Sequence, residues 1–179
     1  MTDFLNEQEF TQLQQDIAAG KARLSIPRSV SRQFFLRVDN KSIKATTGES
    51  ALGKKLLVWL GTIVAPLLFA LCAVIIILEA GVMAALAVPL VGIIWTVLAG
   101  FTSETGDWPS ATSAVALTLI VYLFAQQAYT LALFFFALSL WLHRMTYILA
   151  EYFLSQIVAS SFPAYDMLVD HIKLETSDD

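Results

Sequence analysis

The sequence has few charged residues and almost no cysteine, and each shortage excludes a class of protein. Charged residues make up 15% of the 179 residues, apolar residues make up 57%, and the mean hydropathy is +0.67. A soluble globular domain has more charge and fewer apolar residues. Cys72 is the single cysteine, so the chain has no disulfide framework and no cluster of thiolates for a metal. We therefore expect an integral membrane protein.

Motifs for catalysis, nucleotide binding and metal binding are also missing from the sequence. His143 has no second histidine and no carboxylate at ligand spacing, and no nucleophilic serine motif accompanies it. The long apolar segments contain no acid that would couple transport to protons or ions. We expect no catalytic residue, no metal site and no cofactor.

Long apolar segments fill most of residues 51–162, which we interpret as a membrane domain. The clearest span is 56–78, and a short turn then sends the chain back through 82–101. Both segments are long enough to cross about 30 Å of hydrocarbon. All Lys and Arg residues except Arg144 and Lys173 precede the first span, and this bias places the N-terminus in the cytoplasm. We expect the bacterial inner (plasma) membrane.

The stretch 108–142 has no charged residue and as one helix would be roughly 52 Å long, well beyond one crossing. In a four-span model the chain turns at 126–127, which gives spans 109–126 and 131–149 and a cytoplasmic C-terminus. In a three-span model the third helix is long and its excess packs against another subunit. The absence of Gly and Pro from 110–162 favours the long helix, whereas only four spans return every Lys and Arg to the cytoplasm. We favour an all-α protein with four transmembrane helices in two hairpins.

Arg144 distinguishes the two models. With four spans it lies on the same side as Glu104 and Asp107 of the second linker, so that an ion pair can form. With three spans these residues lie on opposite sides of the membrane. We expect the Arg144 side chain to reach lipid phosphates at the interface, and we prefer this role to catalysis.

Residues 1–50 are interpreted as two short helices in the cytoplasm or at the lipid interface. The first begins at a cap formed by Thr2 or Asp3 and ends at Gly20. The second runs over 29–45 and is amphipathic and basic. Its cations, which we expect to contact lipid headgroups and anionic ones in particular, are Arg28, Arg32, Arg37, Lys41 and Lys44. In the alternative, these cations only set the topology while the apolar face of the helix packs against the first helix.

Small residues recur along the second span at multiples of four, and this spacing lets another helix approach closely. They are Ala84, Gly92, Thr96 and Gly100. Helix packing is the favoured interpretation, and a substrate path is the alternative. Residues 150–162 continue the last span as an amphipathic helix, and 163–179 form an acidic C-terminal tail.

Three functions remain open. The favoured one is a non-catalytic accessory or assembly subunit of a larger membrane complex, whose partners are membrane lipids and other integral membrane subunits or a second copy. The second is a small oligomeric channel or transporter component, which needs a polar path through the membrane. The third is an intramembrane lipid-modifying enzyme, which needs His143, Glu151 and the linker acids to converge. The net charge of −4 and the lack of a reading module argue against nucleic acid as a partner.

Overall fold

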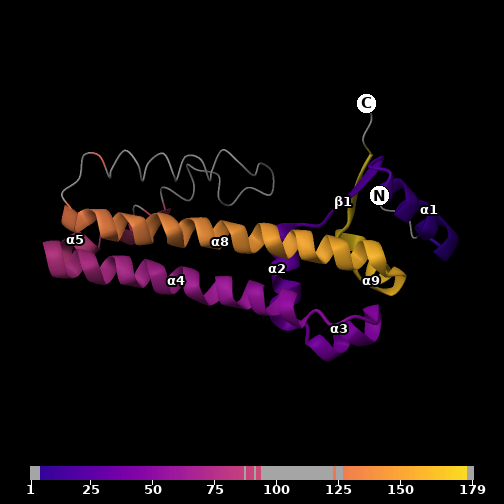
Figure 1. Cartoon of the computed structure of the whole chain (residues 1–179), viewed down its shortest axis with the longest axis horizontal. Helices are drawn as coiled ribbons and strands as arrows, with labels where there is room; N and C mark the ends of the chain where they lie inside the picture. Colours follow the sequence, from indigo (N-terminus) through magenta and orange to yellow (C-terminus); the bar gives the residue numbers. More distant parts are fainter. Residues whose placement is uncertain (1–4, 87, 91, 94–122, 124–126, 177–179) are drawn as a thin grey trace. The chain divides into compact units, whose positions relative to one another are not determined.

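The computed structural model describes residues 5–86, 88–90, 92–93, 123 and 127–176 (Figure 1). The chain divides into two compact units, which we name the terminal unit, Met1–Trp59 with Thr146–Asp179, and the central unit, Leu60–Met145. The helices and strands of the described residues are α1 (Glu7–Ala18), β1 (Ala22–Ser25), α2 (Arg28–Arg37), α3 (Asn40–Thr47), α4 (Leu52–Ala80), α5 (Val82–Ala85), α8 (Gln127–Ser160), α9 (Phe162–Leu168), the 3-10 turn η1 (Val169–His171) and β2 (Lys173–Thr176).

The cap of helix α1 is Asn6, which lies three residues after Asp3 and four after Thr2, the two predicted caps. The side chain of Asn6 accepts hydrogen bonds from the backbone N–H groups of Gln8 and Glu9, at 3.0 and 2.9 Å. The Glu9 carboxylate in turn accepts from the Asn6 N–H at 2.7 Å, which completes a capping box. Gly20 follows the helix with a positive φ of 72°, a backbone conformation that suits glycine best.

The basic segment expected to form one helix over 29–45 forms two. Val38 is extended, with φ −77° and ψ 129°, and it ends α2. The Asp39 side chain then accepts a hydrogen bond from the Ser42 N–H at 3.0 Å and caps α3. An aspartate that bonds its own downstream backbone favours a new helix start over continuation of the old helix.

A two-stranded antiparallel sheet joins the two ends of the chain, and the all-α prediction missed it. Strands β1 and β2 pair with Leu24 opposite Leu174 and Ser25 opposite Lys173. Each strand has four residues, and one strand lies near the start of the sequence and the other near its end. No local turn signals such a pair, because hairpin signals act only between strands that are close in sequence.

The terminal unit has its own hydrophobic core, to which both ends of the chain contribute. Phe10 of α1 stacks against Phe162 and Tyr165 of the C-terminal segment, with ring centroids 5.5 and 5.3 Å apart. The largest fully buried side chains of this core include Tyr165, Phe35, Ile26, Leu154, Val58 and Val158. The Gln14 side chain also donates to the Ala159 carbonyl at 2.8 Å. The predicted acidic tail is therefore an integral part of this unit as far as Thr176.

In the central unit, α4 and α8 lie side by side (Figure 1). The rings of Phe69 and Phe136 lie 6.0 Å apart, and the buried Ser139 hydroxyl donates to the Ala65 carbonyl at 2.7 Å. Cys72 lies in the same apolar cluster. The Ser139 bond joins α8 to the carbonyl that precedes Pro66, in a turn of α4 that lacks one backbone N–H.

Two helices of the described residues are long and apolar enough to cross a membrane. They are Leu52–Ala80 and Tyr129–Ser160. The predicted spans 56–78 and 131–149 lie inside these helices. Of the predicted span 82–101, the structure describes 82–86, 88–90 and 92–93, and of 109–126 it describes Leu123 alone.

Candidate functional site

An ion pair connects the N-terminal basic segment to α8. The Nε atom of Arg28 donates to the Glu151 carboxylate at 2.8 Å, and the two side chains are only 7% and 17% exposed. Arg28 is the first residue of α2, and Pro27 precedes it at the N-cap position. A charge-assisted hydrogen bond between such buried groups fixes the position of one helix against the other.

A second contact lies one turn along both helices. An Nη1 atom of Arg32 donates to the Tyr147 hydroxyl at 3.1 Å, and the guanidinium lies 4.9 Å from the centre of the tyrosine ring. Arg28 and Arg32 are four residues apart, as are Tyr147 and Glu151, so α2 and α8 run in opposite directions where they meet. Two of the predicted lipid-contacting cations thus bind groups inside the terminal unit.

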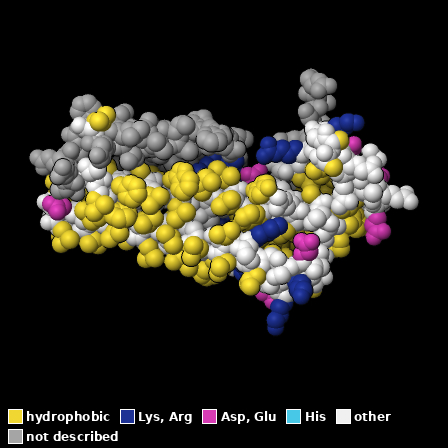
Figure 2. Space-filling view, in the orientation of Figure 1, with side chains coloured by type: hydrophobic (Ala, Val, Ile, Leu, Met, Phe, Trp, Pro, Cys, Tyr) yellow, Lys and Arg dark blue, Asp and Glu magenta, His cyan; other side chains and the backbone are white. Residues whose placement is uncertain are grey.

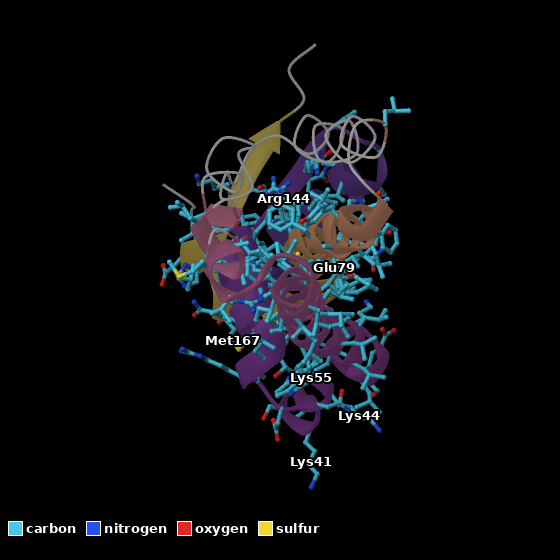
Figure 3. All side chains as sticks on the ribbon, turned by 90° about the vertical axis from the view of Figure 1, so that its left-hand side faces the viewer. Lys41, Lys44, Lys55, Glu79, Arg144 and Met167 are labelled. Atoms are coloured by element: carbon cyan, nitrogen blue, oxygen red, sulfur yellow. The ribbon has the colours of Figure 1, made fainter. Side chains whose placement is uncertain are left out.

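The other cations of the basic segment lie on the surface. Arg37 at the end of α2 is exposed, and so are Lys41 and Lys44 of α3. Helix α3 directs Ile43, which is 2% exposed, into the core of the terminal unit. Figure 3 shows the Lys41 side chain extending away from the ribbon.

Lys54 and Lys55 at the start of α4 are partly buried by contacts that the sequence did not predict. The Nζ atom of Lys55 donates to the Val38 carbonyl at 2.6 Å, at the C-terminal end of α2, where a cation is favoured. The Nζ atom of Lys54 lies 5.9 Å from the centre of the Phe153 ring and 3.5 Å from the Gln156 side-chain oxygen. Both lysines therefore connect the start of α4 to its neighbours.

Asp39 lies close to these lysines and is fully exposed. Hydrogen bonding to the Ser42 side chain, and then to its backbone N–H, holds the pKa of the Asp39 carboxyl below its ordinary value of 3.8. The positive charges of Lys55 and Lys41 act in the same direction. The carboxylate therefore remains ionised in mild acid and keeps its capping role there.

Arg144 lies on α8 and is only 3% exposed, whereas the adjacent His143 is exposed. Glu104 and Asp107, its predicted ion-pair partners, lie outside the described residues. The predicted ion pair and the lipid-phosphate contact of Arg144 both remain predictions.

Of the predicted small-residue stripe, the structure describes Ala84 and Gly92. Ala84 is half-buried on α5. A Cβ atom on Gly92 would lie 3.0 Å from Cε2 of Phe69 and 3.6 Å from Cε2 of Phe136. The Phe69 ring thus lies so close to Gly92 that it would have to shift for a side chain there, whereas the Phe136 ring lies at ordinary contact distance. Thr96 and Gly100 lie outside the described residues.

No group of three or more His, Cys, Asp or Glu side chains in the described part of the chain is arranged to hold a metal ion. The sequence matches no protein-family model, and comparisons with curated proteins and with solved structures likewise gave no match.

Proposed function

We propose that this protein is a non-catalytic accessory or assembly subunit of a larger membrane complex. In this proposal the chain crosses the bacterial inner membrane an even number of times, as four helices in two hairpins, and both of its ends lie in the cytoplasm. The pairing of β1 with β2 is the single observation that carries the topology.

Strand pairing constrains the topology because neighbouring strands of a sheet lie about 4.8 Å apart. Such a ladder cannot form across a bilayer about 30 Å thick. Strand β1 precedes α4, and β2 follows α8. If α4 and α8 both cross the membrane, β1 and β2 must lie on the same side of it. The chain between the two strands must then cross the membrane an even number of times. Four spans meet this requirement and three do not.

The distribution of cations supports a cytoplasmic location for both ends. The terminal unit contains all Lys and Arg residues except Arg144, and cytoplasmic segments near membrane spans are enriched in these residues. In the four-span proposal, 82–101 and 109–126 supply the second and third crossings. Arg144 then lies at the cytoplasmic end of the last span, on the side of Glu104 and Asp107.

The outward faces of α4 and α8 support a role in assembly. Leu67 and Leu78 of α4 are 61% and 79% exposed, and Leu131 and Phe134 of α8 are 53% and 50% exposed. Figure 2 shows hydrophobic side chains covering the visible face of these helices. Apolar surface of this extent requires lipid chains or other apolar helices around it. The contacts of Arg28 with Glu151 and of Lys55 with the Val38 carbonyl join elements of the terminal unit to one another, as expected of a structural subunit.

Co-purification tests the proposed function. The tagged full-length chain would be expressed at its natural level, extracted in mild detergent and analysed by quantitative mass spectrometry. We expect other integral membrane chains at a constant ratio. Recovery of this chain alone overturns the assembly role, and a homo-oligomer that conducts ions in liposomes supports the channel alternative instead.

Two paired variants identify the face that binds the partner. Leu131→Ala with Phe134→Ala truncates the exposed side of α8, and Leu67→Ala with Leu71→Ala truncates the exposed side of α4. We expect one pair to reduce recovery of the partner several-fold while the other serves as its control. If neither pair reduces recovery of the partner, neither face binds it.

A further inference from the structure

The exposed side of α3 carries two of the basic residues of the terminal unit. Lys41 and Lys44 are three residues apart, so they share one face of the helix, and Ile43 projects from the opposite face into the core. Both lysines are exposed, as is Arg37 at the end of α2. Lys and Arg side chains project from the molecule around α3 (Figure 2).

Exposed apolar side chains follow these basic residues in the sequence, at the start of α4. Leu52 and Leu56, in the first two turns of α4, are 60% and 65% exposed, and Leu57 is 52% exposed. Trp59 follows at 45%. Exposed cations beside exposed leucines and a tryptophan are the pattern of a membrane–water interface, where charged groups meet headgroups and apolar groups enter the acyl region.

Positive charge is concentrated here although the whole chain has a net charge of −4. Between the end of α2 and the start of α4, two carboxylates, Asp39 and Glu49, face a larger set of cations. The cations are Arg37, Lys41, Lys44, Lys54 and Lys55. Asp39 is engaged in capping α3, and Lys54 and Lys55 are partly buried. Arg37, Lys41 and Lys44 are therefore the cations of this segment that are open to an external anion.

The length of α4 brings this surface to the lipid headgroups. Its 29 residues form a helix about 43 Å long, close to the thickness of about 40–45 Å of a bilayer with its headgroups. A helix of this length that crosses the bilayer has its first residue in the headgroup layer. Only residues 48–51 separate α3 from that position, and four residues reach at most about 14 Å.

We propose that Arg37, Lys41 and Lys44 form a binding surface for the anionic headgroups of the leaflet that α4 enters. Arg28 and Arg32 are excluded from this surface because they bind Glu151 and Tyr147 within the terminal unit. The surface rests on the membrane location in the proposed function, and it does not depend on a partner chain. The cations of the predicted basic segment thus have two roles. Arg28 and Arg32 hold α2 in the terminal unit, and Arg37, Lys41 and Lys44 bind lipid.

The apolar continuation of the surface favours lipid over an acidic protein as its occupant. An acidic peptide would pair with the cations, but it would leave Leu52 and Leu56 against water. An anionic membrane satisfies both features at once, because the same leaflet supplies negative headgroups and acyl chains.

Lipid selectivity of the purified full-length chain tests this surface. The protein would be reconstituted into phosphatidylcholine vesicles that contain trace spin-labelled phosphatidylglycerol or phosphatidylcholine. Electron paramagnetic resonance then gives the relative association of the two lipids with the protein. The test variant is Lys41→Gln with Lys44→Gln. The matched control is Lys21→Gln with Lys173→Gln, which removes the same charge from two exposed lysines outside α3.

We expect the unmodified protein to prefer phosphatidylglycerol, and the preference to weaken in high salt. The α3 variant should lose most of the preference, by up to about 30-fold if both lysines contact headgroups, and the control should retain it. Equal loss in both variants, or no loss in either, overturns the surface. If the α3 variant keeps the preference but loses a co-purifying chain, the surface binds protein instead of lipid.

The vesicles also separate this inference from the proposed function. Protein that fails to float with vesicles after an alkaline wash is not integral to the membrane, and both proposals then fall. Protein that floats without any preference for the anionic lipid overturns the lipid surface alone. Protein that floats, prefers the anionic lipid and co-purifies with no other membrane chain overturns the assembly role alone.

Discussion

Arg28 and Glu151 are 123 positions apart in the sequence, and their side chains meet at 2.8 Å. One lies at the start of α2 and the other on α8, so the pair joins the N-terminal segment to the last long helix. Arg32 and Tyr147 repeat the connection one turn away. Basic residues that the sequence assigns to lipid are thus used in part to join the two ends of the chain.

Breaking this ion pair should destabilise the terminal unit. Arg28→Met leaves the partly buried Glu151 carboxylate without this cation, and we expect the free energy of unfolding to fall by roughly 3 kcal/mol. Changing both residues, as Arg28→Met with Glu151→Met, removes the uncompensated charge and should restore part of this loss. Chemical unfolding in detergent, followed by circular dichroism, measures each value.

Arg37→Met is the matched control for the ion pair, because Arg37 lies on the same helix and is exposed. Its effect should stay within about 0.5 kcal/mol. Equal losses at the two arginines would indicate a general effect of charge on α2 and would refute a specific role for the Arg28–Glu151 contact.

Substitution of Gly92 tests helix packing in the central unit. In Gly92→Ala the new methyl group would lie 3.0 Å from the Phe69 ring, which must move, and we expect a loss of roughly 1–3 kcal/mol in stability. Gly53→Ala on α4 is the control, since a methyl group there meets no atom within 4 Å. That variant should gain about 0.4–1 kcal/mol, because alanine restricts the unfolded chain. Changes of the same sign in both variants would contradict close packing at Gly92.

Acid should weaken the start of α3 through Asp39. Its pKa is lower in the folded protein than in the unfolded chain, so its contribution to stability is present above the ordinary value of 3.8 and is lost as the pH falls through the lowered value. Asp39→Asn keeps a capping side chain but removes the titration, so the decline in stability with acid should become shallower. Unfolding midpoints measured between neutral and strongly acidic pH show the difference, and identical profiles would exclude Asp39 as a contributor.

The sequence predicted the parts of the fold that depend on local composition. The apolar run 56–78 predicted a long helix, and the structure has that helix as part of α4. The N-terminal cap and Gly20 likewise predicted a helix close to the observed position of α1. The break before Asp39 was missed, because helical spacing of apolar residues continues across a cap.

Contacts between distant segments could not be predicted from one sequence. Nothing local shows that Leu24 lies opposite Leu174, or that Lys55 donates to the Val38 carbonyl. The spacing of residues did hold a signal for the two arginines that bind within the terminal unit. Arg28 and Arg32 lie four residues apart, as do Tyr147 and Glu151, so two complementary helix faces were present in the sequence. Pairing these faces required knowing that α2 and α8 are neighbours.

The side of the membrane on which each end lies tests the central claim most directly. Single cysteines would replace Lys21 and Lys173, both exposed, in a Cys72→Ser background, and a membrane-impermeant maleimide would be added to intact cells and to inside-out vesicles. We predict that both cysteines resist labelling in intact cells and react in inside-out vesicles. Labelling of one cysteine from the outside and the other from the inside would contradict the account, because β1 and β2 could not then pair.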